Sequence, residues 1–229
     1  LPGWYRRGTD VLDLVEECGV DPGTVVLCHL GPSGDDLAYQ EELLRRGAWV
    51  QYDMIGMEVF YADQGVQCPS DEENARWLLR LIERGFGSRL LVSHDIFIKS
   101  LLRRHGGPGY GHILQFFVPR LLRHGFTSYD AVILSDIGYN SFVLPTATWL
   151  SGKSMPNPLI ALADWTRAGG GLMMAGGYLS FQGFQARANF VRSPLADVLP
   201  VTMLEGDDRV EAPQGAAVEL VDAAHQVGA

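Results

Sequence analysis

Three polar residues of the kind that bind metals or move protons stand where apolar segments end. His29 follows TVVLC, Asp53 follows AWVQY, and Asp95 follows RLLVSH. An imidazole and a carboxylate at neighbouring positions could share a divalent cation such as zinc, and the carboxylate could take a proton from metal-bound water. The alternative is a hydrogen-bonded core role, which is the commoner one for a lone histidine at a strand end. The spacing alone leaves both open.

Helices and strands alternate in the elements that must position these residues. Periodicity predicts helices at 9–19, 33–47 and 70–85 and short apolar strands at 24–28, 48–53 and 89–95. The run TVVLC is rich in β-branched residues, as in a parallel strand buried on both faces. Such alternation implies right-handed βαβ units, whose ligands bind at the carboxyl ends of the strands. His29, Asp53 and Asp95 all stand at such ends.

Local signals mark where the helices begin and end. The predicted N-terminal caps are Thr9 or Asp10, then Ser33, then the capping box of Ser70 with Glu73. After GGPGYG, the segment 112–125 predicts a last helix, which Pro119 should kink or divide in two.

Composition excludes several classes of partner. With 229 residues, 47% of them apolar, and a net charge of -9, the chain is globular and acidic. It lacks the basic footprint that nucleic acid requires, and no apolar run reaches the roughly 18 residues of a membrane span. Three cysteines without C-x-x-C spacing argue against a disulfide framework or structural zinc knot. We expect a cytoplasmic protein that binds neither nucleic acid nor membranes.

Residues 1 to about 125 resemble the C-terminal part of a phosphotriesterase-like metal-dependent hydrolase of the amidohydrolase superfamily. The likeness rests on LPGWYRRG, VLCHL and VSHDIF and on matching loops and helix lengths. It implies the last three βα units of a (β/α)₈ barrel. It also implies that His29 binds one metal, and that Asp95 binds the other and acts as general base. A zinc-dependent hydrolase of an ester, lactone or phosphoester, acting on a small molecule, is the expected function.

The sequence departs from this family in its metal ligands. The family also uses an H-x-H pair on strand one, a carboxylated lysine or glutamate on strand four and a histidine on strand five. No H-x-H is present, and LPGWYRR resembles the segment that follows the strand-five histidine. The resemblance therefore implies an incomplete metal site that a second copy or a completing chain would have to supplement.

Loops after the second and third strands carry the candidate substrate contacts. Asp53, Tyr61 and Arg103 are assigned as substrate-binding residues because they lie at or beyond these strand ends. A solvated loop and a basic helix face are the alternative for Tyr61 and Arg103. Met54 and Met57 could line an apolar pocket or fill gaps in the core. His94 is expected to have a packing role.

The chain changes character near FTSYD, and we predict domains at 1–127 and 128–229. The second contains a strand at 129–138, a helix at 157–170 and a strand from 171 that runs into the glycine turn AGGYLSF. It resembles a partial glutamine-amidotransferase-like domain, which implies a flavodoxin-like parallel sheet. Working amidotransferases carry a cysteine nucleophile on such a turn, whereas this one has Gly177 and Tyr178. The implied alternative function is a non-catalytic binding or structural module.

Both parts are made of parallel-sheet material. A further hypothesis is therefore that the strand beginning near residue 129 joins the strands of the first part in one mixed sheet.

Overall fold

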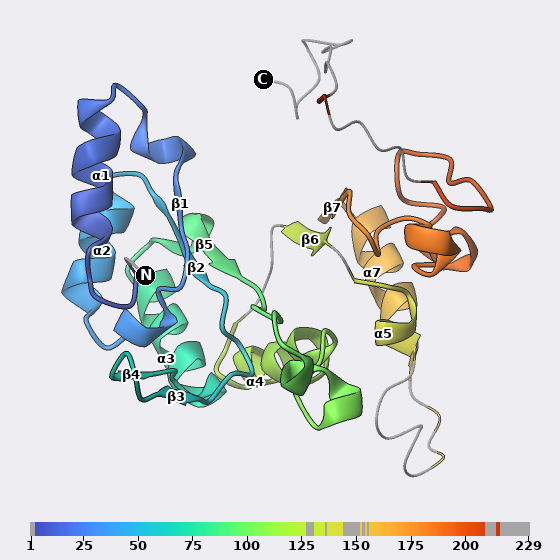
Figure 1. Cartoon of the computed structure of the whole chain (residues 1–229), viewed down its shortest axis with the longest axis horizontal. Coiled ribbons are helices and arrows are strands. Elements are labelled where there is room, and N and C mark those ends of the chain that lie inside the picture. The colour runs from blue at the N-terminus through green and yellow to red at the C-terminus, as the bar shows by residue number, and fades with distance from the viewer. Residues whose placement is uncertain are drawn as a thin grey trace.

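The chain forms two groups of elements, which lie on the left and on the right of Figure 1. This computed structural model describes residues 3–126, 131–135, 137–143, 152, 154, 156–208 and 214–215. We call the described residues up to 126 the first lobe and those from 131 onward the second lobe. No helix among these residues is long and apolar enough to cross a membrane.

Six α-helices and seven strands are assigned within the described residues. The helices are α1 (Gly8–Glu17), α2 (Leu37–Arg45), α3 (Asp71–Glu83), α4 (Val118–Arg123), α5 (Asn140–Val143) and α7 (Pro158–Arg167). The strands are β1 (Val26–Leu27), β2 (Trp49–Tyr52), β3 (Phe60–Tyr61), β4 (Val66–Gln67), β5 (Leu90–Val92), β6 (Ala131–Ser135) and β7 (Gly171–Ala175).

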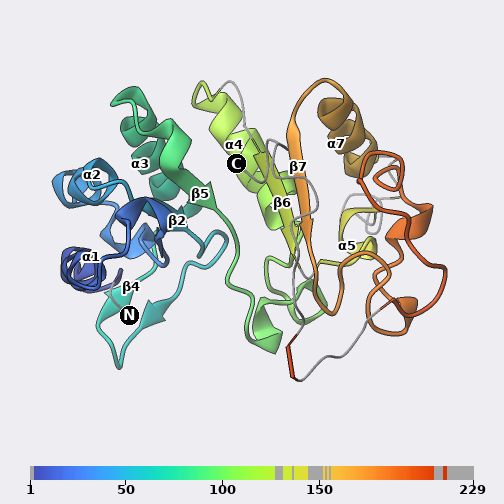
Figure 2. The same cartoon turned by 90° about the horizontal axis from the view of Figure 1, so that it is seen from above.

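A three-stranded parallel sheet organises the first lobe. Its strand order is β1-β2-β5, with Leu27 opposite Val50 and Gln51 opposite Leu91. Figure 2 shows α1, α2 and α3 gathered on one side of this sheet. Val50 is fully buried on that side, since its side chain joins the core formed with the helices. The predicted α/β class with parallel sheets is confirmed, whereas membership of a (β/α)₈ barrel stays a prediction.

The opposite face of the sheet is open, which corrects one expectation. Val26 lies in the run predicted to be buried on both faces, yet it is 43% exposed. Trp49 and Gln51 of β2 are only half-buried, whereas Val50 between them is fully buried. Helices cover this sheet on one face only, so its strands alternate between core and surface.

Two of the predicted helix caps are wrong. The first helix begins at Gly8 after Arg7, without a side-chain cap, so neither Thr9 nor Asp10 fills that role. The cap of α2 is Asp36, whose carboxylate accepts the Tyr39 N–H at 3.1 Å.

Ser33 lies upstream of α2 in a short 3₁₀ turn, where its hydroxyl donates to the Leu30 carbonyl at 3.0 Å. Its hydroxyl is therefore used by the turn and does not reach the start of the helix.

The other two local predictions are confirmed. Ser70 and Glu73 form the capping box of α3, with the Ser70 N–H donating to the Glu73 carboxylate at 2.8 Å. The last helix of the first lobe is divided, because a π-helical turn at Ile113–Phe117 precedes α4. Pro119 stands in the first turn of α4, where its missing N–H costs least.

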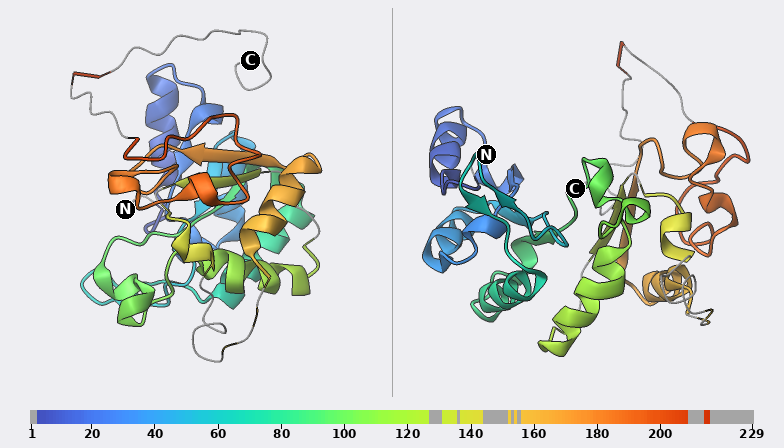
Figure 3. Two further views of the ribbon diagram at one scale, coloured as in Figure 1. Left: turned by 90° about the vertical axis from the view of Figure 1, so that its right-hand side faces the viewer. Right: turned by 60° about the horizontal axis from the view of Figure 1, so that its bottom comes forward.

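The second lobe contains a second parallel sheet. β6 and β7 pair with Ile133 opposite Met173, and Figure 3 shows this pair lying between α4 and the helices α5 and α7. Its core includes Phe142, Leu159 and Phe190, all almost fully buried. The predicted strands and the helix at 157–170 are therefore confirmed within the described residues; residues 129, 130 and 136 lie outside them.

The hypothesis of a single mixed sheet is wrong for the described residues. β5 and β6 belong to different sheets, and no pairing joins the two lobes there. A small antiparallel ribbon, β3 with β4, was also not predicted; it pairs Tyr61 with Val66 in the segment expected to be a loop. Its strands are two residues long, too short to produce a readable alternation of apolar residues.

Candidate functional site

His29 lies two residues beyond the end of β1, in a backbone conformation that residues other than glycine rarely adopt. Its φ is 60°, in the left-handed region, and strain of this kind is often found at functional sites. The conformation is held by Asp53, whose two carboxylate oxygens each accept the His29 N–H at 3.1 Å. Asp53, which follows β2, thus fixes the backbone conformation of the residues that follow β1.

The structure brings together the three side chains singled out in the sequence. His29 Nδ1 lies 3.1 Å from Asp53 Oδ1 and 3.9 Å from Asp95 Oδ2. Asp53 is nearly buried at 6% exposure, whereas the Asp95 side chain is 33% exposed. His29 Nδ1 is itself buried and forms no hydrogen bond with any described residue. Two carboxylates therefore face one imidazole nitrogen, which lies at ion-pair distance from Asp53 but forms no hydrogen bond with a described residue.

Electrostatics at this cluster favour a cation. Burial raises the pKa of the Asp53 carboxyl, and the nearby charge of Asp95 adds to the rise, while His29 opposes it. Burial also raises the pKa of the Cys28 thiol, again with contributions from both carboxylates. A positive charge placed between the two aspartates would relieve their mutual repulsion.

Asp95 does not end its strand as predicted. β5 stops at Val92, and Ser93 continues the ladder by donating its N–H to the Tyr52 carbonyl at 3.0 Å. Asp95 follows in an irregular segment.

Its neighbour His94 accepts the Ile113 N–H at 3.2 Å, which ties this segment to the π-helical turn. Burial lowers the pKa of His94 to about 4, and the charge of His112 adds to this effect. A neutral imidazole can accept such a bond, so the structure gives His94 the packing role expected of it.

Trp4 is a member of the site that sequence reasoning missed. Its ring centroid lies 6.4 Å from that of His29, edge-on, and 5.0 Å from that of Tyr61. Trp4 therefore joins Tyr61 to the polar cluster. Its Nε1 is buried and has no hydrogen-bond partner among the described residues. The signal available was a tryptophan in the LPGWYRRG segment, but nothing in its position there indicated contact with His29.

Other candidates lie against the protein's own side chains. Met54 and Met57 are buried with Cys68 and Leu101 in a small cluster, which fits the gap-filling alternative. The Tyr61 hydroxyl donates to the Met57 sulfur at 3.2 Å.

Arg103 lies against the π-helical turn. Its guanidinium donates to Gln115 at 2.9 Å and its Cζ stands 5.9 Å from the centre of the Phe116 ring. The assignment of Asp53, Tyr61 and Arg103 to substrate binding stays a prediction.

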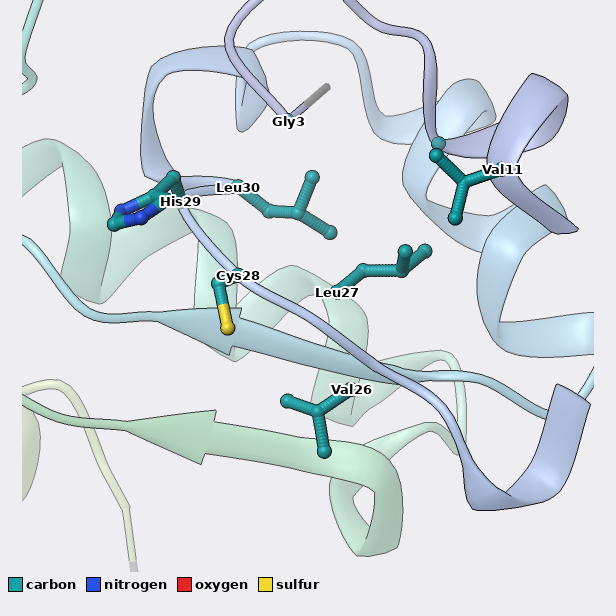
Figure 4. A pocket seen from close by; sticks show the side chains of 8 residues that line it. Gly3, Val11, Val26, Leu27, Cys28, His29 and Leu30 are labelled. Carbon is teal, nitrogen blue, oxygen red and sulfur yellow. The ribbon is translucent and has the colours of Figure 1, made fainter. Parts of the chain in front are cut away.

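A pocket of about 210 Å³ lies beside the cluster and is mainly apolar. It is lined by Gly3, Gly8, Val11, Val26, Leu27, Cys28, His29 and Leu30. Figure 4 shows the side chains of Val11, Leu27 and Leu30 converging, whereas the His29 ring points away from them. The polar groups of the cluster therefore lie outside this pocket, on the other side of His29.

The resemblance found in the sequence implies a divalent metal at this site. Imidazole nitrogen and carboxylate oxygen suit zinc, and the His29 Nδ1, which forms no hydrogen bond to a described residue, is the kind of donor that a metal satisfies. The number of donors falls short, however. The described residues contain no group of three His, Cys, Asp or Glu side chains arranged to hold a metal ion. The residues present therefore match a metal centre in chemistry but not in number.

The fold is a parallel α/β fold with a histidine and two carboxylates beyond its strands, and two known families match the chain. The Phosphotriesterase family matches residues 4–137, and the family described as "Putative glutamine amidotransferase" matches residues 111–229. The chain therefore belongs to the phosphotriesterase family in its first part and to that amidotransferase family in its second. The predicted two-part arrangement is confirmed, and the two matches overlap at 111–137. The exact boundary at 127 stays a prediction.

Curated relatives and a solved structure resemble the first part. The N-acetyltaurine hydrolase of Danio rerio is 36% identical over 124 residues, which are 53% of this chain and 36% of the relative. The human N-acetyltaurine hydrolase is 34% identical over 129 residues, 55% of this chain and 37% of the relative. A resiniferatoxin-binding protein from Rhodobacter sphaeroides is 55% identical with a TM-score of 0.55, covering 56% of this chain and 36% of that one. The chain thus spans little more than a third of each relative.

Proposed function

We propose that this chain carries part of the active site of a metal-dependent hydrolase that acts on an ester, lactone or phosphoester bond. The observation that carries the proposal is the buried His29 Nδ1, which faces the carboxylates of Asp53 and Asp95 without forming a hydrogen bond to a described residue. Membership of the phosphotriesterase family supports it.

The three residues take different roles in this proposal because their surroundings differ. His29 and Asp95 are the metal ligands, and a bound divalent cation such as zinc would polarise the scissile bond and lower the pKa of water. Asp95 also takes the proton of the attacking water, since it is the more exposed of the two carboxylates. Asp53 is buried and accepts the His29 N–H, so it positions His29.

The remaining metal donors would come from outside the described residues. A second copy of the chain, a completing chain or further sequence could supply them. The open face of the first sheet, with Val26 43% exposed, is consistent with such a completion.

An amide is a second candidate for the substrate bond. The two curated relatives described above are N-acetyltaurine hydrolases, and this supports adding an amide to the ester, lactone and phosphoester as a candidate. The competing proposal is a non-catalytic module, favoured in the second part because residues 111–229 contain no cysteine.

Turnover by the purified 229-residue chain tests the proposal. An aryl ester, a lactone, a phosphotriester and N-acetyltaurine would be assayed with and without zinc. Where a second copy of the chain completes the donor set, the proposal predicts zinc-dependent turnover of at least one of them and its loss in Asp95→Asn. Glu17→Gln, at an exposed position on α1, is the matched control and should behave as wild type. Turnover that persists in Asp95→Asn would contradict the assigned role of this carboxylate.

A further inference from the structure

The loop that follows β7 directs several backbone N–H groups at carboxylates from a distant part of the chain. Gln182 N–H donates to Asp208 Oδ2 at 2.8 Å, and Gly183 N–H donates to Asp208 Oδ1 at 2.7 Å. Gln185 N–H donates to Asp207 Oδ2 at 2.9 Å. Three donors of one loop thus hold two carboxylates, without any basic side chain in these bonds.

The backbone of this loop is unusual. Five residues between 181 and 189 have positive φ, and four of them are not glycine: Phe181 (53°), Gly183 (64°), Gln185 (53°), Ala186 (56°) and Asn189 (55°). Left-handed residues in such a run turn successive N–H groups toward one side and create a concave anion-binding surface. So many strained residues in one loop persist only where the surrounding structure enforces their backbone angles.

The loop is held mainly by its own bonds. Phe184 N–H donates to the Tyr178 carbonyl at 2.8 Å, and Ala188 N–H donates to the Gln182 carbonyl at 2.9 Å. The side chain of Gln182, 1% exposed, accepts the Val191 N–H at 3.1 Å. These bonds do not involve Asp207 or Asp208, so the donors are preorganised independently of the carboxylates.

The segment that supplies the carboxylates is held less firmly. Residues 204–207 are exposed, and Leu204 is 64% exposed. This segment has no regular secondary structure within the described residues 201–208. A segment with so little buried apolar surface opens at low cost.

We propose that the loop at 178–190 is a binding site for a carboxylate group, and that Asp207 and Asp208 occupy it as an internal ligand. A carboxylate-bearing small molecule or peptide would compete with them for the N–H groups of Gln182, Gly183 and Gln185. Arg187 lies on the same loop, with its Cζ 5.6 Å from the centre of the Phe184 ring. This site is separate from the cluster at His29 and does not depend on the proposed hydrolase function.

Amide chemical shifts of the ¹⁵N-labelled full chain test the proposal with acetate as the probe. In Asp207→Ala/Asp208→Ala, acetate should shift the amides of Gln182, Gly183 and Gln185 saturably. In wild type the same shifts should need roughly tenfold more acetate, because the tethered carboxylates compete at high effective concentration. Chloride at equal ionic strength is the control for salt, and Asp197→Ala, whose side chain is 81% exposed, is the control variant.

Two results would overturn the proposal. One is a double variant whose other amide signals match wild type but whose loop does not respond to acetate. The other is an equal response in wild type and variant. Should the double variant not fold, Asp208→Asn retains an acceptor without the charge. It should bind acetate more tightly than wild type, and a folded Asp208→Asn with a wild-type response would equally refute the site.

Discussion

The two lobes place polar groups beyond the ends of parallel strands, but they satisfy those groups differently. Beyond β1, the His29 Nδ1 faces two carboxylates and has no hydrogen-bond partner among the described residues. Beyond β7, the loop N–H groups are paired with Asp207 and Asp208 of the same chain. In the two proposals made above, the first site therefore takes a ligand, whereas the second releases an internal one before binding.

The helical segment at 113–123 contributes side chains to the cores of both lobes. Phe117 and Leu121 are buried in the first core, while Leu114, from the same π-helical turn as Phe117, packs against the second core. This segment lies within the overlap of the two family matches. The two parts are therefore joined by a segment that serves both cores.

The largest expected effect is on the first core. Phe117→Ala should cost about 3–5 kcal/mol of unfolding free energy, because Phe117 is fully buried and leaves a cavity. Denaturant unfolding would measure the loss, with Phe97→Ala, 60% exposed, as the control. A loss no larger than that of the control would show that this segment does not belong to the first core.

Asp71 is a carboxylate of the first lobe whose hydrogen-bonding needs are already met by the protein. It accepts the Gly56 N–H at 2.8 Å and lies 2.6 Å from His112 Nε2. Asp71→Ala should cost about 1.5–3 kcal/mol, as expected for hydrogen bonds to a charged group. Thermal unfolding of this variant beside Glu17→Gln would measure the cost, and equal midpoints would contradict the assigned contacts.

The same carboxylate predicts a pH dependence. Burial acts to raise the pKa of Asp71, but the hydrogen bonds from His112 and Gly56 outweigh it and lower the pKa overall. Its stabilisation is therefore complete above the unfolded pKa of about 3.9 and is lost as pH falls through the lower folded value. The stability difference between wild type and Asp71→Asn should shrink only at acid pH. A difference that stays constant down to pH 2 would contradict this account.

The smallest effect is expected at Arg103. Arg103→Ala removes the bond to Gln115 and the contact with Phe116, and should cost about 0.5–1 kcal/mol. Substrate KM should not change if these contacts define its role. A raised KM with unchanged stability would instead support the substrate-binding role predicted from sequence; Arg104→Ala is the matched control.

The sequence predicted features that depend on neighbours in the chain. The capping box of Ser70 and Glu73 and the division of the last helix at Pro119 were predicted because the signals are local. Ser33 was assigned as a cap in place of Asp36 because both residue types suit that position.

Features that depend on distant contacts or backbone angles were not predicted. Trp4 reaches His29 across a separation of 25 residues, and no periodicity encodes that contact. The left-handed backbone at Phe181 and Gln185 is not a preference of those residue types, so the loop that holds Asp208 was invisible in the sequence. The convergence of His29, Asp53 and Asp95 was expected because strand ends in parallel folds meet at one edge.

The thermal unfolding midpoint of the 229-residue chain with and without zinc tests the central claim most directly. A ligand that prefers the native state stabilises it, so zinc should raise the midpoint of wild type and raise it less in His29→Ala. Glu17→Gln should respond as wild type does. No effect of zinc, or an equal rise in wild type and His29→Ala, would contradict the claim that His29 and Asp95 are metal ligands.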